Sequence, residues 1–382
     1  MRVLYFINAG IMGGRERHVH TLVRSLPPAI EALVCAVSGG EATEAMKHDG
    51  LNVHVLGGRN GHDPRIFFRI IHLLRSFKPD IIHAHCSAFI PSASFRLFPD
   101  IPLIMSLHGP AAPTLPAGRA RRPLRAAITK LLSTLPRRPD YYLPVSRATW
   151  NEFLRYYPSA KGEVFYNALN LTGLPSAARE GTSSTDMRST GKKIIGMVGR
   201  MADVKDWPSF VRISAAAMVK DPAVEAWSIG DGPVRSTCEA LWRDLARQNQ
   251  LDPNRLKWLG SRQDARELMT QMSAILITSH SEQLPTTLLE AFAIGVPVVG
   301  FLPEGGTREV LALSKSPCAI LRADRDVDAT ATDVLRVLGD STLRDNLIAE
   351  GYRIVHEHFD MQKLCATQLV KIYQKVIKAK AK

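Results

Sequence analysis

Long hydrophobic runs and paired cysteines are both missing from this chain of 382 residues. Its most apolar stretches, such as residues 292–301, are far shorter than the roughly 18 residues of a membrane-spanning helix, so no spanning helix is expected. The five cysteines lie far apart without a C-x-x-C pair, which argues against a disulfide framework and a cysteine zinc site. The first residues reach asparagine and glycine too early for a signal peptide. We therefore expect a cytoplasmic protein.

Acidic residues are in deficit. The chain has 49 Lys and Arg residues against 36 Asp and Glu residues, which gives a formal net charge of +13. A strongly basic protein attracts anions, such as nucleic acid, an anionic lipid surface or a phosphate-bearing substrate. Because no RNP, helix-turn-helix or zinc-finger pattern is found, nucleic acid is not the expected partner.

Two domains are expected, because the chain is longer than the usual span of one hydrophobic core. Short β-rich runs alternate with helical patterns at residues 3–7, 32–37, 53–56, 81–84, 103–107 and 141–145. A second series follows at residues 194–198, 227–229, 256–259, 274–278, 296–299 and 319–321. Runs that are apolar throughout are typical of strands buried on both faces of a parallel sheet. The prediction is an α/β fold with two doubly wound, Rossmann-like domains.

The domain boundary is predicted from composition. Residues 171–192 are rich in Gly, Ser, Thr and Arg and have no hydrophobic period, so they are interpreted as a linker. The N-terminal domain is then residues 1–170 and the C-terminal domain residues 193–355. Residues 356–382 carry apolar side chains at helical spacing and are predicted to form a C-terminal helix.

A glycine pair follows the first predicted strand. Gly13 and Gly14 precede a helical pattern, and glycines at this place let backbone N–H groups and a helix dipole approach a bound anion. A tight turn without a ligand is the alternative interpretation. The spacing does not match G-x-G-x-x-G, so a nicotinamide dehydrogenase is not favoured.

Two carboxylates follow a strand of the second series. Glu282 lies in the loop after residues 274–278, and Glu290 lies on the next predicted helix. Such a pair can accept hydrogen bonds from hydroxyl groups at two places on one ligand, as sugar and ribose rings require. An acid at a helix N-terminus together with a solvated helix glutamate would be the ordinary interpretation, so the neighbouring motifs decide between the two.

The ordered motifs resemble those of the retaining glycosyltransferases of family four. Residues 281–299 resemble the E-x7-E region of that family. Further segments that match in order are residues 13–18, 79–85, 108–109, 145–146, 166–167, 199–206, 230–233, 258–260 and 305–309. The likeness covers almost the whole chain.

This resemblance implies the GT-B fold, in which two Rossmann-like domains face each other across a cleft and the last helix crosses back to the first domain. It implies metal-independent, retaining transfer of a sugar from a nucleotide diphosphate sugar, with UDP-sugar favoured over GDP-sugar. The acceptor would be lipid-linked or a polysaccharide, bound by the N-terminal domain, and no cofactor is expected. Two alternatives remain: a nucleotide-sugar epimerase of the same fold, and a non-enzymatic protein that binds anions or nucleic acid.

The resemblance also assigns roles to residues. Arg200 and Lys205 would hold the donor diphosphate, and two fixed cations can stabilise a leaving diphosphate without Mg²⁺. Glu290 would hold the ribose, whereas Glu282 and His108 would contact the transferred sugar. The implied catalytic set is His108, Arg200, Lys205 and Glu282. The implied donor-binding set is Gly13, Gly14, Gly199, Arg200, Lys205, Glu282, Leu284, Pro285, Thr286 and Glu290. Gln283 replaces the usual glycine of the family, which leaves the identity of the donor open.

Two patterns are compatible with a metal ion, but no metal site is predicted. His83 and His85 lie on the same side of a strand, yet the sequence offers no third ligand beside them, so structural roles are favoured. The D-x-D pattern at residues 324–326 is typical of metal–nucleotide sites in another glycosyltransferase architecture. It lies away from the other motifs and is interpreted as solvated.

A basic segment lies between Asp100 and Asp140, where no acidic residue occurs. The residues predicted to contact a membrane or the acceptor are Arg119, Arg121, Arg122, Arg125 and Lys130. Leucine and isoleucine side chains alternate with them at helical spacing, and such a helix can lie on an anionic membrane surface. A core-facing helix with a solvated basic face is the alternative. The position within the acceptor domain favours peripheral association with the inner face of the cytoplasmic membrane.

Overall fold

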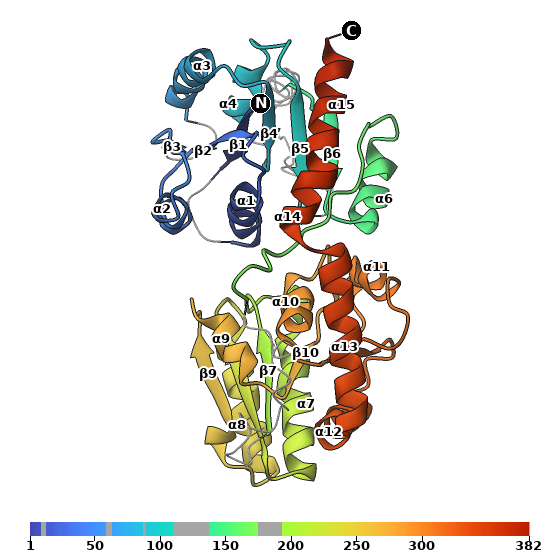
Figure 1. Ribbon diagram of the computed structural model, residues 1–382. Helices are drawn as coiled ribbons and strands as arrows, with labels where there is room; N and C mark the ends of the chain where they lie inside the picture. The colour runs from blue at the N-terminus through green and yellow to red at the C-terminus, as the bar shows by residue number, and fades with distance from the viewer. Residues whose placement is uncertain (9–12, 59–62, 87–88, 110–136, 175–192, 382) are drawn as a thin grey trace. The chain divides into compact units, whose positions relative to one another are not determined.

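The computed structural model describes residues 1–8, 13–58, 63–86, 89–109, 137–174 and 193–381. The chain divides into two compact units (Figure 1). The first unit contains Met1–Asn170 together with Met361–Lys382, and the second contains Leu171–Asp360.

The first unit is built on a parallel sheet. Its strands are β1 (Arg2–Ile7), β2 (Glu31–Ala36), β3 (Val53–Val55), β4 (Ile81–Ala84), β5 (Leu103–Leu107) and β6 (Tyr141–Pro144). Its helices are α1 (Gly14–Arg24), α2 (Glu41–His48), α3 (Arg65–Phe77), α4 (Phe89–Phe95), α6 (Arg147–Tyr156), α14 (Met361–Leu364) and α15 (Val370–Lys380), with the π turn η4 (Cys365–Leu369) between the last two. The strand order is β3-β2-β1-β4-β5-β6. In this doubly wound order the direction of winding reverses between β1 and β4, and ligands bind beyond the carboxyl ends of the strands at such a reversal.

The second unit repeats this topology. Its main sheet contains β7 (Lys193–Val198), β8 (Val224–Ile229), β9 (Leu256–Gly260), β10 (Ala274–Ile277), β12 (Val298–Phe301) and β14 (Ile320–Arg322). A two-stranded sheet is formed by β11 (Ser281–Glu282) and β13 (Glu304–Gly305). The helices are η2 (Asp203–Lys205), α7 (Trp207–Lys220), α8 (Arg235–Gln248), η3 (Pro253–Arg255), α9 (Ala265–Thr270), α10 (Thr286–Ile294), α11 (Thr307–Leu311), α12 (Val327–Gly339) and α13 (Ser341–His358). The order β14-β12-β10-β7-β8-β9 places the reversal between β7 and β10.

Burial explains why the strands form where they do. Every residue of β4 and of β10 is buried, as is β1 from Val3 onward. Helices therefore cover both faces of each sheet, which is the environment that continuous apolar runs predict. The predicted α/β fold with two Rossmann-like units is confirmed.

The C-terminal segment packs within the first unit, where α15 is coloured red in Figure 1. The side chain of Tyr373 is completely buried, and its hydroxyl is 2.8 Å from the Tyr5 hydroxyl and 2.7 Å from Nδ1 of His83. The amide of Gln368 donates to the carbonyl oxygen of Val164 at 2.8 Å. The C-terminal segment is therefore part of the core of the first unit.

The predicted domain boundaries can be compared with the structure at two places. Residues 171–174 of the predicted linker group with the second unit, and residues 175–192 lie outside the described residues. The predicted start of the C-terminal segment at residue 356 falls inside α13, and the chain joins the first unit only at Met361.

In the described ranges, no helix has both the length and the apolar character that a membrane crossing requires. The predicted membrane or acceptor residues, Arg119, Arg121, Arg122, Arg125 and Lys130, lie outside the described residues.

Candidate active site

The loop that follows β7 lies against the loop that follows β8, and glycines make this approach possible. Gly230 and Gly232 have φ angles of +150° and +155°. A Cβ atom on Gly230 would lie 1.8 Å from the carbonyl oxygen of Gly199, and one on Gly232 would lie 2.4 Å from that of Met201. A side chain at either glycine would displace the backbone, so the G-D-G-P segment fixes the loop that contains Arg200.

Arg200 and Lys205 lie in this loop. The side chain of Arg200 is exposed, while its carbonyl oxygen accepts a hydrogen bond from the buried indole of Trp207 at 3.0 Å. The hydroxyl of Thr278, directly after β10, donates to the carbonyl oxygen of Lys205 at 3.0 Å. The backbone of the loop is therefore anchored to the core, and its cationic side chains lie at the carboxyl ends of β7 and β10.

Lys205 and Glu282 form an ion pair at this edge of the sheet. The Lys205 Nζ atom is 2.5 Å from Oε1 of Glu282, and the hydroxyl of Ser279 donates to the same oxygen at 2.7 Å. Glu282 is held on β11, because β11 pairs with β13 and a Cβ atom on Gly305 would lie only 2.3 Å from the Glu282 carbonyl oxygen. Both side-chain bonds engage Oε1, so Oε2 carries no hydrogen bond from a described residue.

Glu290 is bound differently. Arg266 of α9 donates to its Oε1 atom through Nε at 3.0 Å and through Nη2 at 2.8 Å. Thr286, the first residue of α10, is exposed and lies four residues before Glu290, on the same face of the helix. Leu284 and Pro285 are buried and lead into the helix N-terminus, where unpaired backbone N–H groups favour anions.

Sequence reasoning missed three residues of this region: Ser279, Arg266 and Arg325. Arg325 donates to Oδ2 of Asp206 at 2.5 Å and to the carbonyl oxygens of Thr278 and Ser279 at 2.8 and 3.1 Å. It ties the Lys205 loop to the loop after β10. Its only signal in the sequence was its place at the centre of the D-x-D pattern.

The two aspartates of the D-x-D pattern have local partners. The carboxylate of Asp324 pairs with Arg322 at 2.7 Å, and Asp326 caps α12 by accepting a hydrogen bond from the backbone of Ala329 at 2.9 Å. Both aspartates are exposed, as predicted.

The first unit contributes the other predicted residues. Gly13 is the N-cap of α1, and Gly14 is the first residue of this helix. A Cβ atom on Gly13 would lie 2.9 Å from Oε2 of Glu16, whereas one on Gly14 would meet no atom within 4 Å. The glycine pair thus begins a helix, as predicted. Residues 9–12, which precede the pair, lie outside the described residues.

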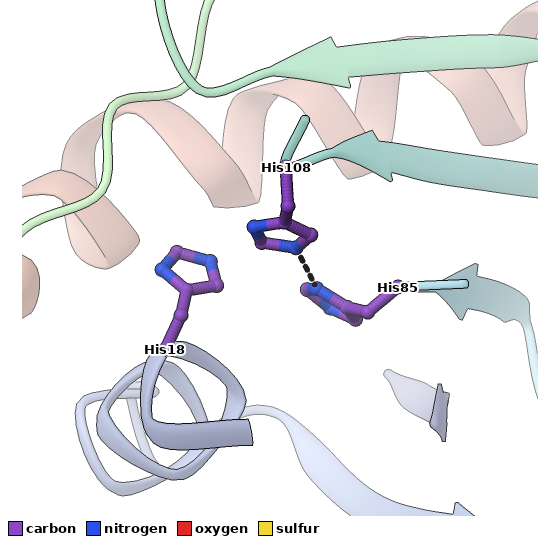
Figure 2. Close-up of side chains that lie close together, drawn as sticks. All are labelled: His18, His85 and His108. Carbon is purple, nitrogen blue, oxygen red and sulfur yellow. Dashed lines mark hydrogen bonds between the residues drawn. The ribbon is translucent and has the colours of Figure 1, made fainter. Parts of the chain in front are cut away.

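His108 is part of a histidine cluster (Figure 2). His18 comes from α1, His85 follows β4 and His108 follows β5. One ring nitrogen from each lies within 4.8 Å of the other two, and Nδ1 of His85 is 3.0 Å from Nε2 of His108. Burial lowers the pKa of His18 to about 4. Burial also lowers the pKa values of His85 and His108 well below the usual value, and neighbouring histidines and Arg15 add to this.

His83 lies next to His85, with the ring centroids 4.3 Å apart, but it bonds within the core. His83 is completely buried, and its ring nitrogens lie 2.7 Å from the Tyr373 hydroxyl and 2.9 Å from the Ser106 hydroxyl. Its role is structural, as favoured from the sequence. The sequence shows no third ligand beside His83 and His85, because His18 and His108 come from other elements of the fold.

Two family models together match most of the chain. Residues 12–172 match the family model described as Glycosyltransferase Family 4. Residues 192–340 match the model described as Glycosyl transferases group 1. The two matches fall on the two units, one on each.

The curated relatives are distant. A 2-deoxystreptamine N-acetyl-D-glucosaminyltransferase of Niallia circulans is 27% identical over 41% of this chain, and this match spans only 39% of the relative. The lipopolysaccharide core biosynthesis glycosyltransferase LpsD of Rhizobium meliloti is 22% identical, and 94% of each chain is covered.

The solved structures show the fold. The crystal structure of Anabaena HepE in complex with UDP and glucose matches with a TM-score of 0.76 and 18% identity, and it covers 98% of this chain and 100% of HepE. The likeness extends over both units, and the family models match each of them. The chain therefore belongs to the glycosyltransferases of family four and has the GT-B fold.

Proposed function

We propose that this glycosyltransferase moves a sugar from a nucleotide diphosphate sugar with retention of configuration and without a bound metal ion. The proposal rests on the ion pair of Lys205 with Glu282 at the reversal of the second sheet. The loop that contains Lys205 also contains the exposed Arg200. A UDP-sugar is favoured over a GDP-sugar, and the complex of HepE with UDP supports this choice.

Arg200 and Lys205 are proposed to bind the donor diphosphate. When the nucleoside diphosphate leaves, negative charge grows on its oxygens, and preorganised cations stabilise that charge. The guanidinium of Arg200 can bind two phosphate oxygens at once. The N-terminus of α10, which Leu284, Pro285 and Thr286 lead into, would add backbone N–H donors. Together with the loop at Gly199, against which Gly230 packs, these groups would form a binding site for the diphosphate that requires no metal.

Glu282 and Glu290 are proposed to bind the two rings of the donor. Glu282 would accept a hydrogen bond from a hydroxyl of the transferred sugar, because Lys205 and Ser279 bind one of its oxygens and leave the other. Glu290 lies one helical turn beyond Thr286 and would accept from the ribose hydroxyls. Arg266 orients its carboxylate for this role.

Retention needs no enzymic carboxylate nucleophile in this proposal. The leaving phosphate would help to deprotonate the acceptor on the same face of the sugar, so that departure and attack occur side by side. In the first unit, the resemblance assigns His108 a contact with the transferred sugar and assigns Gly13 and Gly14 a contact with the donor.

The separate roles proposed for Glu282 and Glu290, on the sugar ring and the ribose ring of the donor, can be tested. We expect Glu290→Gln to weaken binding of a free nucleoside diphosphate by about 10-fold to 100-fold, the value of one or two hydrogen bonds to a charged group. Glu282→Gln should leave that binding unchanged and reduce transfer. Calorimetry with UDP and a transfer assay separate these effects, and Glu267→Gln, an exposed change on α9, is the matched control. Wild-type UDP binding by the Glu290 variant would show that the ribose role is wrong.

A lipid-linked or polysaccharide acceptor is proposed, together with peripheral association with the inner face of the cytoplasmic membrane. The name of LpsD supports a lipopolysaccharide acceptor, whereas the relative from Niallia circulans is named for a small aminocyclitol. The basic segment that contains Arg121, Arg122 and Arg125 would contact the anionic surface. Sedimentation with vesicles should show binding that rises with anionic lipid and weakens when these arginines become Glu; absence of binding at low salt would contradict the proposal.

A further inference from the structure

Buried nitrogen atoms of the histidine cluster have no partner. Both ring nitrogens of His18 and the Nε2 atom of His85 are inaccessible to solvent and make no hydrogen bond with a described residue. A neutral imidazole always has one N–H group to donate and one lone pair to accept. Leaving these groups unpaired in the interior costs free energy. A ligand that binds one ring nitrogen of His18 would remove part of this cost.

We propose that His18, His85 and His108 bind one divalent transition-metal ion of the zinc type. Neutral imidazole is the commonest metal ligand in proteins and suits Zn²⁺, Cu²⁺ or Ni²⁺, whereas Mg²⁺ and Ca²⁺ prefer oxygen ligands. Three protein ligands with a fourth position for water is a common arrangement for Zn²⁺. Figure 2 shows the three rings converging from α1 and from the ends of β4 and β5.

The distances fit a site that closes by a small movement. Nitrogens bound tetrahedrally to one Zn²⁺ lie about 3.4 Å apart, because each is about 2.1 Å from the ion. Nδ1 of His85 and Nε2 of His108 are already 3.0 Å apart. The ligand atoms of all three residues lie within 4.8 Å of one another, so the ring of His18 must approach the other two by at most about 1.4 Å and the pair of His85 and His108 must separate by about 0.4 Å. Side-chain torsions allow adjustments of this size.

Neighbouring charges set the expected strength of binding. The positive charge of Arg15 acts on His85 and His108 and opposes a bound cation. Glu16, beside Arg15 on α1, is also mostly buried, and its negative charge would offset part of this repulsion. We therefore expect an exchangeable ion with micromolar affinity rather than a permanent structural one.

The test is a titration of the metal-free full-length protein with Zn²⁺ in competition with a chromophoric chelator. One ion per chain is expected, and His18→Gln and His85→Gln should each weaken binding at least about 10-fold, since each removes one of three ligands. His72→Gln, an exposed change on α3, should bind like the wild type. The proposal is wrong if the wild-type protein binds no Zn²⁺, or if the two cluster variants bind it as tightly as the wild type.

A second measurement does not depend on the variants folding. Co²⁺ added to the wild-type protein should give the intense visible absorption of a four-coordinate site with nitrogen ligands, and one equivalent of Zn²⁺ should abolish it. A spectrum like that of six-coordinate aqueous Co²⁺ would overturn the proposal.

One consequence rests on the proposed function. An ion at this cluster occupies His108, so Zn²⁺ should inhibit sugar transfer and EDTA should restore it, although the reaction itself requires no metal. If Zn²⁺ binds to the cluster without inhibiting transfer, the metal site stands and the proposed contact of His108 with the transferred sugar is wrong. Failure of the titration would instead remove the metal site and leave the proposed transfer reaction intact.

Discussion

Replacement of Arg200 or Lys205 by Ala is expected to reduce turnover by about 100-fold to 1,000-fold, the usual effect of removing one group that stabilises charge in the transition state. Both residues are proposed to act on the oxygens of the departing diphosphate. The melting temperature should change little, because Arg200 is exposed and the ion pair of Lys205 with Glu282 is partly exposed. Steady-state kinetics with a UDP-sugar measures the loss.

Matched cations elsewhere in the same unit serve as controls. Lys220 at the end of α7 and Arg247 in α8 are both exposed, and their Ala variants should retain wild-type turnover. Equal losses in all four variants would indicate a general effect of charge. Full activity in either the Arg200 or the Lys205 variant would contradict the proposed binding of the diphosphate by these two residues.

Removal of residues 361–382 is expected to unfold the first unit. The segment buries Met361, Cys365, Leu369, Ile372, Tyr373 and Val376, each at most 5% exposed. Burial of an apolar side chain contributes about 1.5–3 kcal/mol, so the six together contribute about 9–18 kcal/mol, which is comparable with the roughly 5–15 kcal/mol that stabilises a typical domain. Thermal unfolding followed by near-ultraviolet circular dichroism should show loss of one transition, while the second unit retains its own.

A shorter truncation is the control. A chain that stops after Lys380 keeps the ion pair of Lys380 with Asp140 and loses only the exposed Ala381 and the last residue, so it should melt like the full-length protein. Tyr373→Phe keeps the buried ring but removes the hydroxyl that bonds to Tyr5 and His83, so it should lower the melting temperature by a few degrees. If the chain that lacks residues 361–382 kept both transitions unchanged, the place of α15 in the core of the first unit would be wrong.

The strands of both sheets could be predicted because burial on both faces produces continuous apolar runs. The predicted runs at residues 3–7 and 274–278 differ from β1 and β10 by a single residue at one end. The strands β11 and β13 were missed, because two residues are too few to show a period. They nevertheless fix Glu282, so the local geometry of the site depends on an element without a sequence signal.

The site could be predicted only in part, and for a related reason. The motif order identified Lys205 and Glu282 separately, but their contact joins residues 77 positions apart and no spacing rule reveals it. Arg325 was hidden in a pattern that suggested a metal site. His18, His85 and His108 follow different strands, and only the sheet order brings the ends of those strands together.

Saturation-transfer NMR in the presence of EDTA measures whether this chain binds a nucleotide diphosphate sugar without a metal ion. With the wild-type protein, at least one UDP-sugar from a panel of UDP-sugars and GDP-sugars should give a strong saturation-transfer signal. The signal should be much weaker with the Arg200→Ala and Lys205→Ala variants. No signal from any nucleotide diphosphate sugar, or a signal that appears only after Mg²⁺ is added, would contradict the account.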